Sequence, residues 1–267
     1  MSGKTISLAG VRHFFESHRP GGAPIEVLRP TTTEVRSEQF VALLGPSGCG
    51  KTTVLNMVAG LVRPTQGAVM LNGAAPRLGD ADVGYLLARD ALLPWRTALQ
   101  NVALPLQVRG VGRRERERLA RGVLDEVGLG NFLEAFPAQL SHGMRQRVAV
   151  ARTLVVEPST LLMDEPFSAL DAQTRLGLQQ KFLQLWERVR CTVMFVTHDL
   201  TEAILMADRV VVFSARPGEI RADFPVELER PRSLVDLQGT DDFHRLFRRI
   251  WDVFREEVKA YEAAPQT

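Results

Sequence analysis

The chain has 267 residues, of which 45% are hydrophobic and 24% are charged, and its formal net charge is +2. These values are those of an ordinary globular protein, so they exclude wholesale disorder and give no sign of a nucleic-acid partner. Two cysteines, Cys49 and Cys191, form no disulfide framework and fit a reducing compartment. We find neither a signal-peptide pattern nor an apolar run approaching the roughly 18 residues of a membrane span. Any work at a membrane is therefore expected to be done as a soluble partner.

Short apolar runs alternate with helical patterns along most of the chain. Two strand-like segments flank the turn-forming segment SHRPGGAP (17–24). Further strands are predicted at 39–44, 67–73, 159–164, 191–198 and 209–214, with another ending near Leu87. Helices are predicted from about Thr53, over much of 97–136, and at 141–156, 172–189 and 200–207. Continuous apolar strands alternating with helices predict an α/β fold with a parallel sheet covered on both faces.

The C-terminal part, residues 215–267, contains the segment ERPRS (229–233) and then a helical pattern from about Asp241 to Ala260. The apolar residues of that pattern fall on one face of the helix. They are Phe243, Leu246, Phe247, Ile250, Val253 and Phe254. We expect this helix to dock on the domain.

The stretch GPSGCGKTT matches G-x-x-x-x-G-K-[ST] between a predicted strand and a predicted helix, which is the context that the motif requires. Its glycines let the backbone turn so that N–H groups face inward, and the helix start adds a positive end. Lys51 is expected to reach the β- and γ-phosphates, and the Thr52 hydroxyl to bind Mg²⁺. The alternative is a chance Gly-rich turn. The predicted phosphate-binding residues are Gly45, Pro46, Ser47, Gly48, Cys49, Gly50, Lys51, Thr52 and Thr53.

Two carboxylates and a histidine follow buried strands, at the ends where ligands bind in open α/β sheets. Asp164 is expected to hold Mg²⁺, and Glu165 to polarise the water that attacks the γ-phosphate. His198 follows the next strand in the same way, and we expect it to contact the γ-phosphate and hold the water in place. The alternatives are solvated charges and a structural histidine. Asp199 is expected to cap the helix that begins near Leu200.

The segment QLSHGMRQRVAVAR (139–152) predicts a basic amphipathic helix with Ser141 as its N-cap. A serine and a glycine at a helix N-terminus also form an anion site. A phosphate loop and a second anion site elsewhere in the chain suggest a nucleotide shared between two copies.

The ordered set GPSGCGKTT, LSHGMRQR, LLMDEP, SALD and VTHD resembles the ATPase subunits of ABC transporters over nearly the whole chain. Within this family, LLPWRT, DEPFSALDAQTR and FSARPGEI followed by ERPR are similar to the nitrate, sulfonate and taurine importer branch. The resemblance implies an α/β P-loop NTPase fold with a RecA-like core and an antiparallel β part. It also implies a single domain over 1–267, with a helical subdomain at about 88–157 and a C-terminal extension at about 215–267.

The same resemblance implies ATP and Mg²⁺ as cofactors and a second ATPase subunit, most simply another copy of this chain. Each ATP would be held between one copy's phosphate loop and the other's LSHGM segment, where Ser141 and the N–H of Gly143 contact the γ-phosphate. Residues 168–171 would run along the seam. An aromatic residue should stack on adenine, and we favour Phe15 over Phe14; a plain core aromatic is the alternative.

The function implied is ATP hydrolysis at the cytoplasmic face of the inner membrane, driving uptake of a small solute such as nitrate, a sulfonate or taurine. A separate membrane permease would be the direct partner, and a periplasmic solute-binding protein an indirect one; no nucleic acid is expected. The helical subdomain would pass the closure of the dimer to the permease. Nothing in this chain specifies the solute.

Two positions depart from the family pattern. His142 stands third in a signature that is commonly Leu-Ser-Gly-Gly. Ala88 stands where relatives carry a glutamine that ligates Mg²⁺, helps place the water and links the core to the helical subdomain. Alanine offers no side-chain donor or acceptor, and Asp90 could supply one only if the loop shifts.

Two rival functions follow. Ala88 allows a weakly active or regulatory ATPase paired with a more complete subunit. A non-transport cassette of DNA repair or translation is the other rival, but the chain has neither a long coiled-coil insert nor a second motif set.

Overall fold

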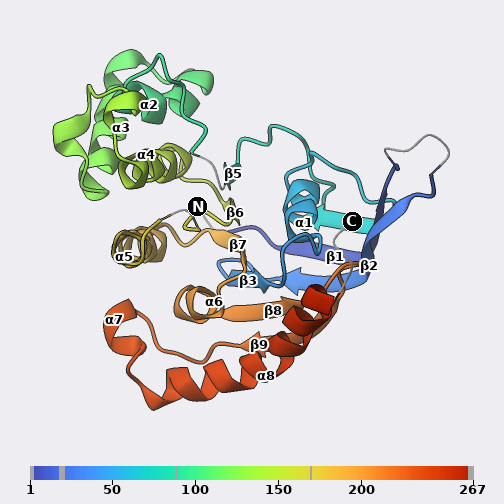
Figure 1. The fold of residues 1–267 in the computed structure, drawn as a ribbon. Helices are drawn as coiled ribbons and strands as arrows, with labels where there is room; N and C mark the ends of the chain where they lie inside the picture. The colour runs from blue at the N-terminus through green and yellow to red at the C-terminus, as the bar shows by residue number, and fades with distance from the viewer. Residues whose placement is uncertain (1–2, 18–21, 88–89, 169, 264–267) are drawn as a thin grey trace.

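The computed structural model describes residues 3–17, 22–87, 90–168 and 170–263 and forms two β-sheets with helices around them (Figure 1). The six-stranded sheet has the order β5-β6-β7-β3-β8-β9, and the three-stranded antiparallel sheet has the order β2-β1-β4. The strands of the larger sheet are β3 (Phe40–Leu44), β5 (Val83–Leu86), β6 (Thr160–Asp164), β7 (Thr192–Thr197), β8 (Arg209–Phe213) and β9 (Ile220–Pro225). Those of the smaller sheet are β1 (Ile6–Phe15), β2 (Ile25–Val35) and β4 (Gln66–Leu71).

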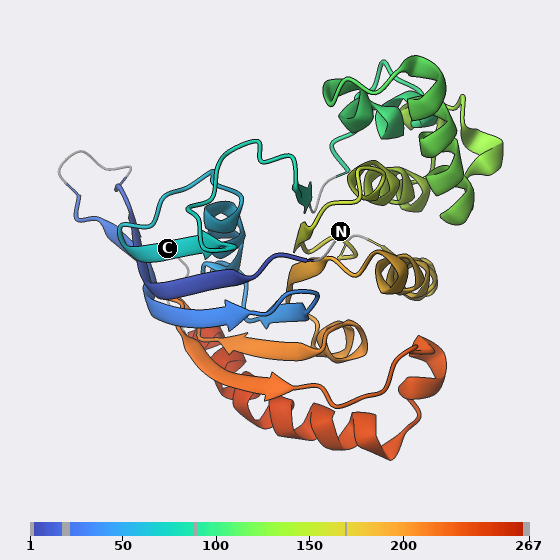
Figure 2. The same cartoon turned by 180° about the vertical axis from the view of Figure 1, so that it is seen from behind.

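The helices in the described ranges pack around these sheets. The helices are α1 (Lys51–Val58), α2 (Ala98–Val108), α3 (Arg113–Glu126), α4 (His142–Leu154), α5 (Ala172–Val189), α6 (Leu200–Met206), α7 (Leu234–Leu237) and α8 (Asp241–Ala263), with 3-10 turns η1 (Gly130–Phe132) and η2 (Pro137–Gln139). Helices α2, α3 and α4 gather at one end of the molecule, beyond the β5 edge, in both views (Figures 1 and 2). None of the described helices has an apolar stretch long enough to cross a membrane.

Helix α1 packs between the two sheets. Its buried residues Val54, Leu55 and Val58 belong to one apolar cluster with Ile6 and Leu8 of β1 and with residues of β3, β7 and β8. Six of its eight residues are buried, including the polar Lys51 and Thr53, while Thr52 at its start is exposed. The helix therefore holds the loop at its start against both sheets.

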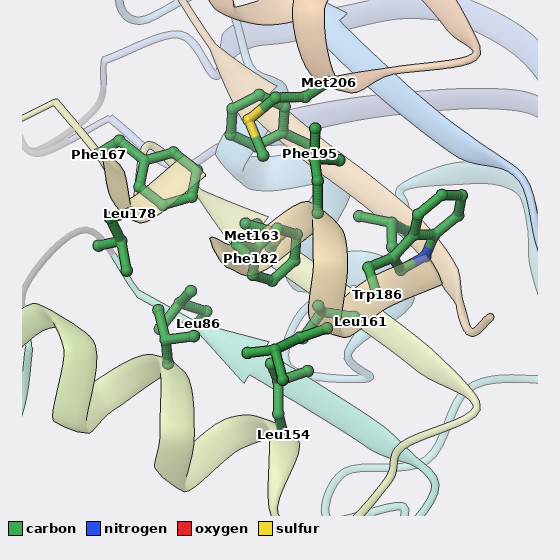
Figure 3. Close-up of a cluster of buried hydrophobic side chains, with 14 of the residues drawn as sticks. Leu86, Leu154, Leu161, Met163, Phe167, Leu178, Phe182, Trp186, Phe195 and Met206 are labelled. Atoms are coloured by element: carbon green, nitrogen blue, oxygen red, sulfur yellow. The ribbon is translucent and has the colours of Figure 1, made fainter. Parts of the chain in front are cut away.

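A second apolar core lies between the larger sheet and helices α4, α5 and α6 (Figure 3). Leu86 of β5 and Leu154 of α4 approach it from one side, and Trp186 of α5 lies at the other, its indole N–H donating to the Cys191 carbonyl at 2.8 Å. Phe40 meets Trp186 edge to face, with 5.3 Å between ring centroids. The core thus fixes α4 and α5 beside the strands that carry the site.

Most predicted elements are confirmed, including both helix caps: the side chains of Ser141 and Asp199 accept N–H groups of the first turns of α4 and α6. The predicted parallel sheet is confirmed for β5, β6, β7, β3 and β8, and β9, which was not predicted, adds an antiparallel strand beside β8 at the edge. This strand alternates half-buried and exposed residues, among them Arg221 and Asp223, and so lacks a continuous apolar run. The helical stretch 97–136 divides at Gly110, whose left-handed backbone, with φ of 76°, ends the helix.

Helix α8 lies along β8 and β9 and packs against α6 (Figure 1). The predicted apolar face of this helix is confirmed: Phe243, Leu246, Ile250 and Phe254 are buried. Phe247 and Val253 are half-buried at the margin of the core.

Candidate active site

Three neighbouring strands deliver the predicted site residues to one edge of the larger sheet. β6, β7 and β3 are adjacent and parallel, and Asp164, Val196 and Leu43 lie in one row across them. The phosphate loop follows β3, Glu165 follows β6 and His198 follows β7. Because the carboxyl ends of parallel strands share an edge, segments far apart in sequence meet there.

The phosphate loop has the strained backbone that its glycines permit. Gly50, the N-cap of α1, has a φ of 99°, and a Cβ there would lie 2.8 Å from a methyl carbon of Leu28. The Lys51 ammonium is buried and donates to the carbonyls of Gly45 and Pro46, at 2.7 Å each. The loop is thus closed around its own lysine. Burial raises the pKa of the Cys49 thiol, so this buried side chain stays in its protonated, unreactive form.

Thr52 and Asp164 meet across the phosphate loop and the end of β6. The Thr52 hydroxyl donates to Asp164 Oδ1 at 2.9 Å. Burial raises the pKa of the Asp164 carboxyl, and the hydrogen bond from Thr52 opposes this. The described residues contain no group of three or more acidic, His or Cys ligands that could hold a metal ion. A hydroxyl and one carboxylate suit Mg²⁺, which takes oxygen ligands and completes its shell with water and substrate phosphates.

Glu165 and His198 form a pair at the same edge. The distance from His198 Nδ1 to Glu165 Oε2 is 3.0 Å. The hydrogen bond from His198 lowers the pKa of Glu165 against the opposing effect of burial, and the same bond raises the pKa of His198. Glu165 also has a φ of 45°, uncommon for a residue with a side chain, and its N–H donates to the Val196 carbonyl at 3.0 Å. The neighbouring strand therefore fixes the backbone that carries this carboxylate.

A buried carboxyl that sequence reasoning missed supports the turn before His198. Glu202 Oε2 accepts from the Thr197 hydroxyl, and Glu202 Oε1 accepts from Gln179 of α5 at 2.6 Å. Thr197 Oγ1 in turn accepts the N–H of Asp199 at 3.0 Å. Burial raises the pKa of Glu202 to about 7. The only signal in the sequence was a glutamate on the apolar face of a short helix.

A pocket of about 320 Å³ opens beside the phosphate loop and is lined by loop residues 47, 48 and 50–53 together with Glu165 and Phe15. The Phe15 ring is 44% exposed, whereas the Phe14 ring is covered by the guanidinium of Arg12, 4.8 Å from its centroid. Of the two aromatics considered for adenine, Phe15 thus lines the pocket. Arg216 lines it too, and sequence reasoning did not single it out.

The LSHGM segment stands apart from this pocket. Ser141 Oγ accepts the Met144 N–H at 3.2 Å, as an N-cap does. Gly143 lies against Thr174 of α5, where a Cβ would come 2.7 Å from its methyl group. Neither Ser141 nor Gly143 is among the residues lining the phosphate-loop pocket. One copy therefore brings the loop, the carboxylates and His198 together but not the second anion site.

The α4 start is tied to the loop after β5. Arg145 donates to Asp90 Oδ2 at 2.9 Å and lies 3.3 Å from His142 Nδ1. Arg152 donates to the Asp90 carbonyl at 2.8 Å. Asp90 is thus directed to α4, and Ala88 lies outside the described residues. The remaining ring nitrogen of His142 is buried with no hydrogen-bond partner in the described part of the chain.

A phosphate loop together with a carboxylate pair and a histidine on neighbouring strands defines a P-loop ATPase. Comparison with known proteins narrows the class. The family model described as ABC transporter matches residues 28–168. The chain belongs to this family, as an ATPase and ATP-binding subunit of its nitrate/taurine importer-like branch.

The relatives cover most of the chain. An uncharacterised ABC transporter ATP-binding protein of Methanocaldococcus jannaschii is 44% identical over 89% of this chain and 87% of its own length. A taurine import ATP-binding protein of Rhizobium johnstonii is 43% identical over 78% and 80%, and a nitrate import ATP-binding protein of Synechocystis is 41% identical over 76% and 77%. Among solved structures, a dimeric post-hydrolysis state of the ATP-binding cassette MJ0796, bound to ADP and Pi, has a TM-score of 0.74. It is 32% identical and covers 84% of this chain and 100% of that one.

Proposed function

We propose that this chain is the ATP-hydrolysing subunit of an importer that drives uptake of a small solute, such as nitrate, a sulfonate or taurine, through a separate membrane permease. The observation that carries the proposal is the meeting of the phosphate loop, Asp164, Glu165 and His198 at one sheet edge. The names of the taurine and nitrate import relatives support the solute class. A periplasmic solute-binding protein would deliver the solute on the far side of the membrane.

In this proposal the loop 45–53 cradles the phosphates of ATP, and Lys51 exchanges its two carbonyl partners for phosphate oxygens. Thr52 and Asp164 would hold Mg²⁺, which when bound offsets phosphate charge. Glu165 accepts a hydrogen bond from the water that attacks the γ-phosphorus, while the bond to the ADP oxygen breaks. His198, held by Glu165, would contact the γ-phosphate and help to hold the attacking water.

The same proposal makes the working unit a pair of copies. The distance of Ser141 and Gly143 from the pocket of their own chain is explained if they close the pocket of a second copy. Their helix start would present N–H groups and a positive dipole end to the γ-phosphate. The dimeric cassette among the structural neighbours supports this arrangement.

We propose that the permease contacts the groove between β5 and α2. This groove, of about 430 Å³, is lined by Tyr85, Leu104, Pro105 and Val108 among others, and Val108 is 81% exposed. The groove joins β5 of the larger sheet to α2. A segment of the permease bound there would move when the two copies close.

The experiment that tests the proposal is substitution of the attacking-water residue. Glu165→Gln keeps the size and acceptor oxygen of the side chain but removes the carboxylate charge. We expect ATP-dependent dimers that persist on a sizing column and an ATPase rate at least about 100-fold lower. A Glu165→Gln variant that hydrolysed ATP at the normal rate would overturn the assignment.

A further inference from the structure

The loop after β8 lies against the phosphate loop at contact distance. A Cβ on Gly218 would come 1.9 Å from the Cys49 carbonyl oxygen, so only glycine allows this approach. The Gly218 N–H donates to the Val27 carbonyl at 2.8 Å, and the Gly218 carbonyl accepts the Arg29 N–H at 2.9 Å. The loop is thus fixed to β2 and to the phosphate loop together.

Internal bonds and helix α8 hold the rest of this loop. Ser214 Oγ donates to the Pro217 carbonyl at 3.0 Å and accepts the Glu219 N–H at 3.0 Å. Glu257 of α8 accepts the Ala215 N–H at 3.0 Å. The residue between these anchors, Arg216, is therefore carried on a rigid support.

Arg216 places a cationic side chain at the nucleotide pocket. Its side chain is exposed, lines the pocket with Phe15 and Val27, and makes no ion pair or hydrogen bond within the described ranges. Lys51, by contrast, is occupied by two carbonyl oxygens. A planar guanidinium suits paired phosphate oxygens, so the free charge is matched to a nucleotide.

The anchors also indicate which end of the nucleotide Arg216 faces. Lys51, Asp164 and Glu165 mark the γ-phosphate end. The Arg216 loop is bonded to β2, whose first residue, Ile25, pairs with Phe15, the aromatic on the adenine side. We therefore assign Arg216 to the base and ribose side of the pocket, and the catalytic pair to the γ-phosphate side.

We propose that Arg216 is a nucleotide-binding residue that pairs with the phosphate nearest the ribose and raises the affinity for ATP and ADP alike. It takes no part in the hydrolysis step. The inference rests on the proposed nucleotide site and adds an affinity contact supplied by the C-terminal part of the chain. Its support comes from α8 through Glu257, which links that helix to the nucleotide.

Titration of the full chain with ATP and with ADP tests this proposal, using Arg216→Ala and Arg216→Lys. Arg248→Ala, an exposed arginine on α8 remote from the pocket, is the matched control because it removes the same charge. We expect Arg216→Ala to raise both dissociation constants about tenfold, Arg216→Lys to raise them less, and the control to change neither. The KM for ATP should rise while kcat at saturating ATP stays near the wild-type value.

Unchanged dissociation constants for both nucleotides in Arg216→Ala would overturn the proposal. A loss confined to ATP would also overturn it, because Arg216 would then act at the γ-phosphate. Lys51→Ala distinguishes a wrong assignment of Arg216 from a wrong assignment of the nucleotide site itself. If Lys51→Ala loses nucleotide binding and Arg216→Ala does not, only the inference on Arg216 is wrong; if both bind normally, the phosphate-loop assignment is wrong.

Discussion

The phosphate-loop edge and the start of α4 differ in how they are built, although we propose an anion site at each. At the edge, β3, β6 and β7 fix each functional group by strand register, as when the Glu165 N–H bonds to the Val196 carbonyl. The α4 start is held by side chains: Arg145 reaches Asp90, and Gln146 donates to the Pro166 carbonyl at 2.6 Å. Strand register thus sets the position of each group at the edge, whereas single side-chain contacts orient the start of α4. We expect changes at the edge to act on nucleotide binding and hydrolysis within one copy, and changes at the α4 start to act on the pairing of two copies.

The largest expected effect separates the two sites by function. Ser141→Glu places a carboxylate where the partner's γ-phosphate would lie, so charge repulsion should prevent ATP-driven dimers and lower the ATPase rate at least about 100-fold. Binding of ATP to the single chain should remain, because the phosphate loop is untouched. Sizing chromatography with ATP and a nucleotide titration measure the two effects.

Lys51→Ala is the matched variant on the other side of this comparison. It should lose nucleotide binding itself, and with it dimer formation. If Ser141→Glu lost ATP binding by the isolated chain as well, the idea that the two sites belong to different copies would be contradicted.

The stability of the folded chain should also depend on pH, through the ionisation of Glu202 beside this edge. Its pKa is raised from 4.5 to about 7 in the folded chain. Between these values the unfolded chain has lost the proton that the native state retains, so stability is full below pH 4.5 and declines as pH rises towards 7. Glu202→Gln should remove this decline, which amounts to at most about 3 kcal/mol.

Urea unfolding of wild type and Glu202→Gln at pH 5 and pH 8 measures this effect. The variant should gain stability relative to wild type at the higher pH. Glu262→Gln, an exposed glutamate near the end of α8, should leave the pH dependence unchanged. Parallel curves for wild type and Glu202→Gln would show that the buried carboxyl does not titrate in this range.

The two regions also differ in how far the sequence predicted them. The phosphate loop, Asp164, Glu165 and His198 each follow an apolar run directly, so local pattern placed them on the sheet edge. Glu202 and the Arg145–Asp90 pair depend on contacts that no local pattern carries; that pair spans 55 positions. Arg216 was visible only as a basic residue in a Pro-Gly turn. Strand β9 was not predicted, because an edge strand with alternating exposure has no continuous apolar run.

The link between α4 and the loop after β5 can be broken directly. Arg145→Ala removes a half-buried pair, with side chains 30% and 22% exposed, and should cost about 1 kcal/mol of stability. The ATPase rate should fall several-fold, because Ser141 and His142 lose their support. Asp90→Asn is the matched change, since it keeps the shape and removes the charge.

The double variant, Arg145→Ala with Asp90→Asn, tests whether the two residues affect the ATPase rate through their shared ion pair. If Arg145 and Asp90 act through their pair, the ATPase loss in the double variant should be no greater than in Arg145→Ala alone. Additive losses would mean that each residue acts independently.

The smallest expected effect concerns Ala88, which lies between the two regions in sequence. The family resemblance implies a glutamine at this position, and Asp90, the polar neighbour considered as a substitute, is paired with Arg145. If the missing amide limits hydrolysis, Ala88→Gln should raise the ATPase rate a few-fold without altering ATP affinity, because an amide can place water where a methyl group cannot. Ala91→Gln, in the same loop, is the control. A rate unchanged by Ala88→Gln would show that Glu165 and His198 place the water unaided, and it would remove the case for a weak or regulatory ATPase.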